Sequence, residues 1–387
     1  MIEYAIEMGI DDPVCMADSL TKLALAQRLS EAYEPALQNY AAAIGILETH
    51  ENMLSEKLIE PLLGMGSTHL ANGHADLALP AFDRALHLRH VNDGPHSLNQ
   101  AEILDAIVTA DLENDEPEAA LRVTDRMQNL YAREFGPDSE ELLPVLDRKA
   151  DILESTGRYR EERLARLQAV HIIERHRGES DLTLVDPYVA LGRSYLKEVD
   201  QFIFRSEPTS ETGETYLKKA VAVAERNADA DWQVRKNTLM ELGDYYTVLD
   251  VQDKARRCYR DAWDIMSSAA DRMDQRRLDL ERMAILRRPA LDRYAHFGYR
   301  SVPDDVDSTE YSEGYVVALF SVNHRGRATD ITIAASSPAG YSEMEFRVRR
   351  ALRNFVYRPR YENGIPVATD NQQFRHEFLY TASESDD

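Results

Sequence analysis

The stretch Leu62-Leu63-Gly64-Met65-Gly66-Ser67-Thr68-His69, followed by the turn Ala71-Asn72-Gly73-His74, contains the spacing that decides most of the fold. After the turn, Ala78, Phe82 and Ala85 fall on one helix face, since residues three or four apart lie together on a helix. Gly66 and Ala78 are small where two helices would cross. The stretch therefore predicts a pair of packed helices.

The pattern recurs along the chain. Ala36, Ala78 and Ala120 follow one another at intervals of 42 residues. The match is clear again between Leu239 and Ala262 and looser in the third and fourth units. We expect a mostly α array over residues 1–288, closed by a capping helix from Ala269 to Arg288, where Pro289 would end it.

These residues resemble the tetratricopeptide repeat, in which a Leu-Gly pair and an aromatic residue precede an Ala, aromatic, Ala series. The period of 42 exceeds the usual 34 and is similar to the long-helix repeats of kinesin light chains. The resemblance implies a right-handed helical solenoid with a concave groove, lined by the first helix of each unit. An unknown protein would bind in that groove.

The end of the chain has a different pattern. The run Tyr315–Val322, the turn Asn323–Arg327 and a second run from Thr329 to Ile333 together predict a β-hairpin. An amphipathic helix should follow, with Ser342 and Glu345 forming a capping box. A last strand would end at Tyr380. We expect a small α+β domain over residues 314–380, an acidic linker over 289–313 and a solvated tail over 381–387.

The order hairpin, helix, strand resembles the C-terminal domain of TonB energy transducers. The residues that carry the resemblance are Gly314, Gly326, Ser336-Ser337-Pro338, Phe355-Val356-Tyr357-Arg358-Pro359 and Asn363-Gly364-Ile365-Pro366-Val367. The resemblance implies a periplasmic domain that binds an extended partner peptide beside its last strand, by β-augmentation. The receiving edge would be Gln373, Phe374, Arg375, His376, Glu377, Phe378 and Leu379.

The charge of the chain limits the classes of partner. The formal net charge of the 387 residues is −23, which disfavours nucleic acid and anionic membranes, because both need a positive surface. Residues 314–380 differ from the rest, with nine arginines and no lysine against six carboxylates. This domain could therefore dock on an acidic partner.

Several other sites are not expected. No stretch approaches 18 apolar residues, and Met1–Met8 has neither a basic nor an apolar leader region, so we expect no membrane span and no signal peptide in the given chain. The sequence has no Gly-x-Ser-x-Gly, His-Glu-x-x-His, P-loop or Cys-x-x-Cys motif. We accordingly expect no catalytic residues, no cofactor and no metal.

Two functions remain open. The first is a non-enzymatic interaction protein, accessory to TonB-linked transport in the periplasm or at the outer membrane. The second is a structural scaffold, unrelated to transport, whose C-terminal domain mediates self-assembly as a homodimer through paired edge strands.

Overall fold

The structure is a computed structural model that describes residues 12–201, 213–227, 230–291 and 312–380. These residues form two compact units, Met1–Glu179 and Ser180–Asp387. The chain is mostly helical and ends in a small region of strands and one helix, so the expected fold class is confirmed. The sequence predicts a loop at Glu207–Gly213, of which only Gly213 is described. Residues 292–311 of the expected acidic linker and the expected tail, 381–387, also lie outside the described residues.

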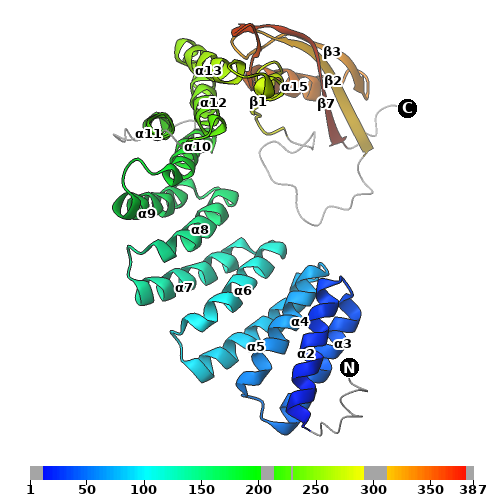
Figure 1. The fold of residues 1–387 in the computed structure, drawn as a ribbon. Coiled ribbons are helices and arrows are strands. Elements are labelled where there is room, and N and C mark those ends of the chain that lie inside the picture. The colour runs from blue at the N-terminus through cyan, green and yellow to red at the C-terminus, as the bar shows by residue number, and fades with distance from the viewer. Residues whose placement is uncertain (1–11, 202–212, 228–229, 292–311, 381–387) are drawn as a thin grey trace, which may run out of the picture. The chain divides into compact units, whose positions relative to one another are not determined.

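The described residues of the first unit, 12–179, contain four helix pairs (Figure 1). They are α2 (Pro13–Leu29) with α3 (Tyr33–His50), α4 (Ile59–Ala71) with α5 (Ala75–Asp93), α6 (Ala101–Glu113) with α7 (Pro117–Phe135), and α8 (Leu143–Ser155) with α9 (Tyr159–Arg177). The predicted helix contact is confirmed, because a Cβ on Gly66 would lie 2.5 Å from the Phe82 ring. Ala36, Ala78 and Ala120 are fully buried on the second helices.

The repeat is more regular than its small and aromatic residues indicate. Helices α4, α6 and α8 each have 13 residues, and α5, α7 and α9 each have 19. Each long helix ends at a glycine with positive φ, at Gly94, Gly136 and Gly178. Glycine adopts this conformation without the steric cost of a side chain, so each of these glycines can end its helix. The three glycines are 42 residues apart, which is the period of the repeat. The third and fourth units are therefore full members of the array.

The second unit begins with further helices and ends with the strands. Its elements are α10 (Val185–Gln201), α11 (Gly213–Arg226), α12 (Trp232–Val248), α13 (Gln252–Ser267), α14 (Met273–Asp279), β1 (Ala284–Arg287), β2 (Ser312–Val322), β3 (Ala328–Ser337), α15 (Ser342–Asn354), β4 (Val356–Arg358), β5 (Arg360–Glu362), β6 (Ile365–Val367) and β7 (Thr369–Tyr380). The main sheet is antiparallel, with strand order β3-β2-β7, and α15 packs on one of its faces (Figure 1).

The predicted turn between β2 and β3 is confirmed, and a second tight turn joins β5 to β6. In the β2–β3 hairpin, the Asn323 N–H donates to the Arg327 carbonyl at 2.9 Å, and the Asn323 side chain accepts from the Arg325 and Arg327 N–H groups. Asn363 and Gly364 join β5 to β6 with φ values of 52° and 74°. Two consecutive positive φ angles are what a tight two-residue hairpin requires.

Two local predictions are wrong. The expected capping helix does not reach Arg288, because α14 ends at Asp279 and residues Ala284–Arg287 form β1, which pairs with β4. The pairing supplies this segment with main-chain hydrogen bonds that a single sequence cannot reveal. The capping box is also absent, because the Glu345 carboxylate accepts from the Ser336 hydroxyl at 2.7 Å and no side chain caps α15.

A buried ion pair joins the strand region to the last helix pair. The Arg358 Nε donates to the Asp244 carboxylate on α12 at 2.8 Å, and Nη1 donates to the Asp279 carbonyl at 3.0 Å. The Tyr259 hydroxyl donates to the same carboxylate at 2.7 Å. Burial raises the pKa of Asp244, and the Arg358 guanidinium opposes this effect. Arginine stays protonated, so the Arg358 guanidinium favours the ionised form of the Asp244 carboxyl that it contacts.

The β5–β6 hairpin covers the end of the helix array next to this ion pair. Tyr361 is 1% exposed, and its ring centroid lies 5.3 Å from that of Tyr259. Its N–H donates to the Leu280 carbonyl at 2.7 Å, and Gly364 lies against the Trp263 ring. The apolar end of a repeat array needs such a cover. Here the cover is a β-hairpin of the strand region together with the short α14.

We expect Arg358→Met to lower the free energy of unfolding by about 3–5 kcal/mol, because it leaves the buried Asp244 carboxylate without its cation. Urea denaturation of the full chain measures the loss. Arg256→Met is the matched control, since Arg256 and its partner Asp253 are exposed and should contribute under about 1 kcal/mol. Equal losses in the two variants would contradict the role of the buried pair.

A second prediction concerns acid stability. Hydrogen bonds from the Lys218 and Lys254 ammonium groups lower the pKa of Glu214 from 4.5 to about 2. A carboxyl whose pKa is lower in the folded state stabilises the fold above the unfolded value and loses this contribution as pH falls. The melting temperature of the wild type should therefore fall more steeply between pH 4.5 and pH 2 than that of Glu214→Gln. Parallel curves would show that these contacts do not stabilise the fold.

Candidate partner-binding surfaces

The last strand, β7, lies at an edge of the main sheet. Within the part of the chain that the structure describes, it pairs with β2 alone. From Gln372 to Tyr380 it faces Phe320 to Ser312 without any shift of register. All seven residues of the predicted receiving edge, Gln373 to Leu379, lie in this regular segment. Their binding of a partner strand remains a prediction.

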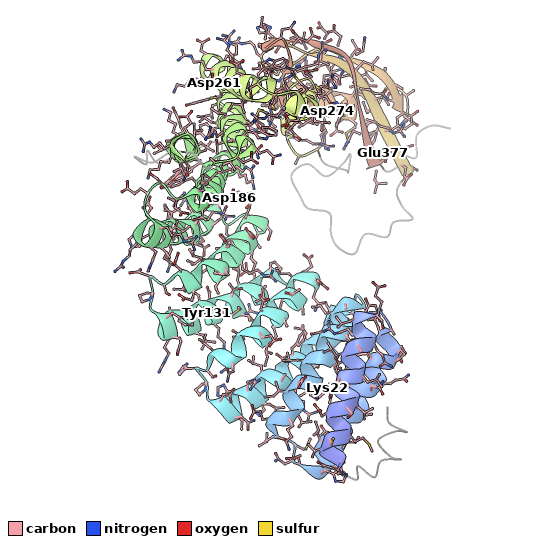
Figure 2. All side chains as sticks on the ribbon, viewed as in Figure 1. Lys22, Tyr131, Asp186, Asp261, Asp274 and Glu377 are labelled. Atoms are coloured by element: carbon pink, nitrogen blue, oxygen red, sulfur yellow. The ribbon has the colours of Figure 1, made fainter. Side chains whose placement is uncertain are left out.

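Side chains alternate between the two faces of the sheet along this segment. Phe374, His376 and Phe378 face the core, where Phe378 is 1% exposed and lies 5.5 Å from the Tyr341 ring centroid. Arg375 and Glu377 are exposed on the other face and form an ion pair at 3.0 Å. Glu377 is labelled in Figure 2. The face toward the core holds β7 in register, and the charged face is open to a partner.

A small cavity of about 190 Å³ lies beside the same edge. It is lined by Glu313, Gly314, Tyr315, Arg375, Glu377, Phe378 and Leu379. A Cβ on Gly314 would lie 2.7 Å from both the Phe378 ring and the Ser337 carbonyl oxygen, so glycine is required for this packing. The Arg375 guanidinium lies 4.3 Å from the Tyr315 ring centroid and borders the cavity. The hollow could receive one side chain of a strand added to β7.

The other edge of the sheet, β3, is less regular. Its pairing with β2 has register shifts after Val317 and after Leu319. Asp330 has a φ of 53°, which is uncommon for a residue other than glycine. Irregularities of this kind protect an edge strand against pairing with another chain. Strand β7 has irregularities of this kind only at its beginning, where Asn371 has a φ of 56° and the register shifts before Gln372. The segment Gln372–Tyr380 therefore has the better geometry for an added strand.

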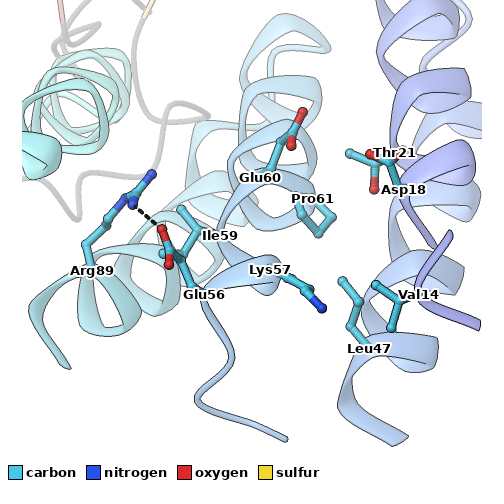
Figure 3. A pocket seen from close by; sticks show the side chains of 10 residues that line it. All are labelled: Val14, Asp18, Thr21, Leu47, Glu56, Lys57, Ile59, Glu60, Pro61 and Arg89. Atoms are coloured by element: carbon cyan, nitrogen blue, oxygen red, sulfur yellow. Dashed lines mark hydrogen bonds and ion pairs between the residues drawn. The ribbon is translucent and has the colours of Figure 1, made fainter. Parts of the chain in front are cut away.

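The first unit has cavities along its first helices. One of about 450 Å³ lies between α2 and α4, with Asp18 and Thr21 on one wall and Glu60 and Pro61 on the other (Figure 3). Another of about 420 Å³ lies at α6, α7 and α8. It is lined by Ala101, Glu102, Asp105, Thr124, Met127, Tyr131, Pro144, Val145 and Arg148.

The two cavities occupy equivalent places in the repeat. Asp18 and Glu102 are separated by two periods of 42 residues, and so are Leu47 and Tyr131. Sequence reasoning placed a groove along the first helices but did not identify the residues that line it. Comparing residues that are 84 positions apart, two repeat periods, could have identified the lining residues. This comparison requires that the ends of the helices, and with them the repeat boundaries, are known.

Among the described residues, no group of three or more His, Cys, Asp or Glu side chains is arranged to hold a metal ion. No helix among the described segments is long and apolar enough to span a membrane. Burial raises the pKa of the Cys258 thiol to about 11, which keeps it in the unreactive protonated form at neutral pH.

Comparisons with known proteins give distant similarity. No family model and no curated protein matches the chain. Among solved structures, BtubC (BKLC) from P. vanneervenii is 15% identical, covering 74% of this chain and 98% of that chain, with a TM-score of 0.43. A putative kinesin light chain from Podosopora anserina with TPR-like repeats is 12% identical, covering 57% and 99%, with a TM-score of 0.45. At these scores the similarity carries no conclusion about function.

The free edge of β7 leads to a prediction about amide exchange in the unliganded full chain. Successive N–H groups of a strand point to opposite sides, so one set bonds to β2 and the other faces the open edge. The amides of Arg375 and Glu377 belong to one set, and those of Phe374, His376 and Phe378 belong to the other. One set should exchange at least ten times faster than the other, as measured by NMR. Slow exchange in both sets would show that another segment or a second copy covers this edge.

Proposed function

We propose that the chain is a protein-interaction scaffold in which β7 takes up an extended strand of a partner protein. The single observation that carries the proposal is the regular pairing of Gln372–Tyr380 in β7 with β2, next to an edge with no pairing partner among the described residues. Unpaired main-chain N–H and C=O groups on such an edge supply affinity, and alternate side chains supply specificity.

The attachment of the strand region to the last helix pair supports this proposal. The Arg358–Asp244 ion pair and the buried Tyr361 fix the region to α12 and α13. An edge strand that is already ordered loses less conformational freedom when it binds. The scaffold would therefore present β7 in its binding conformation before the partner arrives.

The cavities between the first helices of the first unit would serve a different protein. Each is lined by exposed carboxylates together with apolar side chains, among them Leu47 in one cavity and Met127 and Tyr131 in the other. Surfaces of this mixed character are typical of transient protein interfaces. The scaffold would then link two proteins, one through the helix pairs and one through β7.

The resemblance of residues 314–380 to TonB C-terminal domains gives the finer form of the proposal. The partner of β7 would be an extended segment of an outer-membrane transporter, and the chain would act in the periplasm as an accessory to TonB-linked transport. A fusion of the native open reading frame to alkaline phosphatase, which is active only after export, tests the compartment. An inactive fusion would contradict the periplasmic form and leave the strand-binding proposal in place.

Self-assembly is the second candidate function, because the same regular edge could pair with β7 of another copy. Sedimentation equilibrium of the full chain distinguishes the two. A concentration-dependent dimer that Arg375→Pro abolishes would favour self-assembly, whereas a monomer would favour a different partner.

The strand-binding proposal predicts the effect of proline in β7. We expect a peptide array to yield peptides that bind the full chain saturably. If the N–H groups of Arg375 and Glu377 point away from β2, Arg375→Pro or Glu377→Pro should lower the affinity for these peptides at least tenfold, because proline cannot donate a hydrogen bond to an added strand. If these N–H groups instead bond to β2, both proline variants should have a lower melting temperature than the wild type. In that case His376→Gly, which retains the N–H, is compared with His376→Pro. Unchanged affinity in every folded proline variant would show that β7 is not the binding edge.

A further inference from the structure

The outer face of α15 has an unusual composition. The helix buries Met344, Val348 and Leu352 against the sheet, and all three are fully buried. Phe346 lies on the opposite side of the helix and is 62% exposed. A large aromatic residue at the centre of the solvent face of an amphipathic helix has no role in the core of this domain.

Three arginines surround this phenylalanine. Arg349 and Arg350 are three and four residues after Phe346, and Arg353 is one turn further, so all four side chains form one continuous surface. We call this surface, Phe346 with Arg349, Arg350 and Arg353, the α15 patch. Its three arginines are exposed.

The arginines of the α15 patch have no carboxylate partner within the described ranges, 12–201, 213–227, 230–291 and 312–380. The two carboxylates of the same helix are engaged elsewhere, Glu343 with Arg347 at 2.6 Å and Glu345 with the Ser336 hydroxyl. The whole chain has 68 acidic residues against 45 basic ones. Three adjacent arginines without a carboxylate partner among the described residues are therefore a local exception to the charge of the protein.

We propose that the α15 patch binds an acidic peptide segment of a partner protein that carries one large apolar side chain. Arginine forms paired, charge-assisted hydrogen bonds with carboxylates, and clusters of arginine are a recurring means of recognising acidic motifs. Phe346 offers an apolar surface that would contact the apolar side chain of the segment and shield the ion pairs from water.

The charge of the protein favours a peptide over larger anionic surfaces. A bilayer or a nucleic acid would approach a wide area of a chain whose net charge is −23, and would meet its carboxylates as well as the α15 patch. A short peptide meets the local positive charge alone. Stable membrane binding would also require more than one exposed phenylalanine and three basic groups.

Binding at the α15 patch does not compete with strand addition at β7. Helix α15 packs on one face of the sheet (Figure 1). Its residues Met344, Val348 and Leu352 are buried against that face, whereas the residues of the α15 patch are exposed. The open edge of β7 runs along the sheet itself. The proposal is therefore independent of the function proposed for β7.

The experiment uses the full chain and a fluorescein-labelled peptide of eight alternating Asp and Glu residues around a central Leu-Trp pair. Fluorescence anisotropy should give saturable binding that weakens as salt concentration rises. We expect Phe346→Ser to weaken it at least threefold, and the triple variant Arg349→Ser, Arg350→Ser, Arg353→Ser at least tenfold. The single variant Arg350→Glu replaces the triple variant if the triple variant fails to fold by circular dichroism.

Two variants serve as matched controls. Arg257→Ser removes an exposed arginine of α13, and Leu164→Ser removes an apolar side chain that is 67% exposed. Neither should change the affinity. Three results would overturn the proposal: no saturable binding by the wild type, equal binding of a peptide in which Gln and Asn replace the acidic residues, or an equal loss in the control variants. Sedimentation with phosphatidylglycerol vesicles supplies a fourth, since vesicle binding that depends on the α15 patch would assign it to a membrane.

Discussion

The Arg358–Asp244 ion pair is the interaction on which the second unit depends. It joins a strand residue to a helix residue 114 positions earlier, in a site where both side chains are largely buried. A charge in such a site is tolerated because the partner and further donors satisfy it, here the Tyr259 hydroxyl. Removing either side chain would leave the other as a buried charge without a counter-charge. We therefore expect the strand region and the last helix pair to unfold as one unit.

This attachment changes how the strand region can function. Sequence patterns alone favour a separate domain at the end of a linker. In the structure, Tyr361 closes the apolar end of the helix array and β1 extends the contact by pairing with β4. The β7 edge and the α15 patch are consequently fixed relative to α12 and α13. A scaffold built in this way can present two surfaces to partners in a constant arrangement.

Much of the local structure could be predicted from the sequence, because it depends on residues close together in the chain. The helix pairs follow from Ala and Gly at crossing points, and the hairpins from Asn323 and from Asn363-Gly364. The misses all depend on distant contacts. Residues 284–287 have helical composition but pair with β4, and Glu345 accepts from Ser336 on the preceding strand instead of capping its own helix.

The sequence by itself determined the 42-residue period, the mostly helical fold, the alternation of Phe374, His376 and Phe378, and the basic character of residues 314–380, since each is a property of neighbouring residues. Only the tertiary structure decided which edge of the sheet is regular and how Arg358 finds Asp244. It alone also left the arginines beside Phe346 without carboxylate partners among the described residues. These features depend on groups that folding brings together from far apart, and no local pattern records such distances.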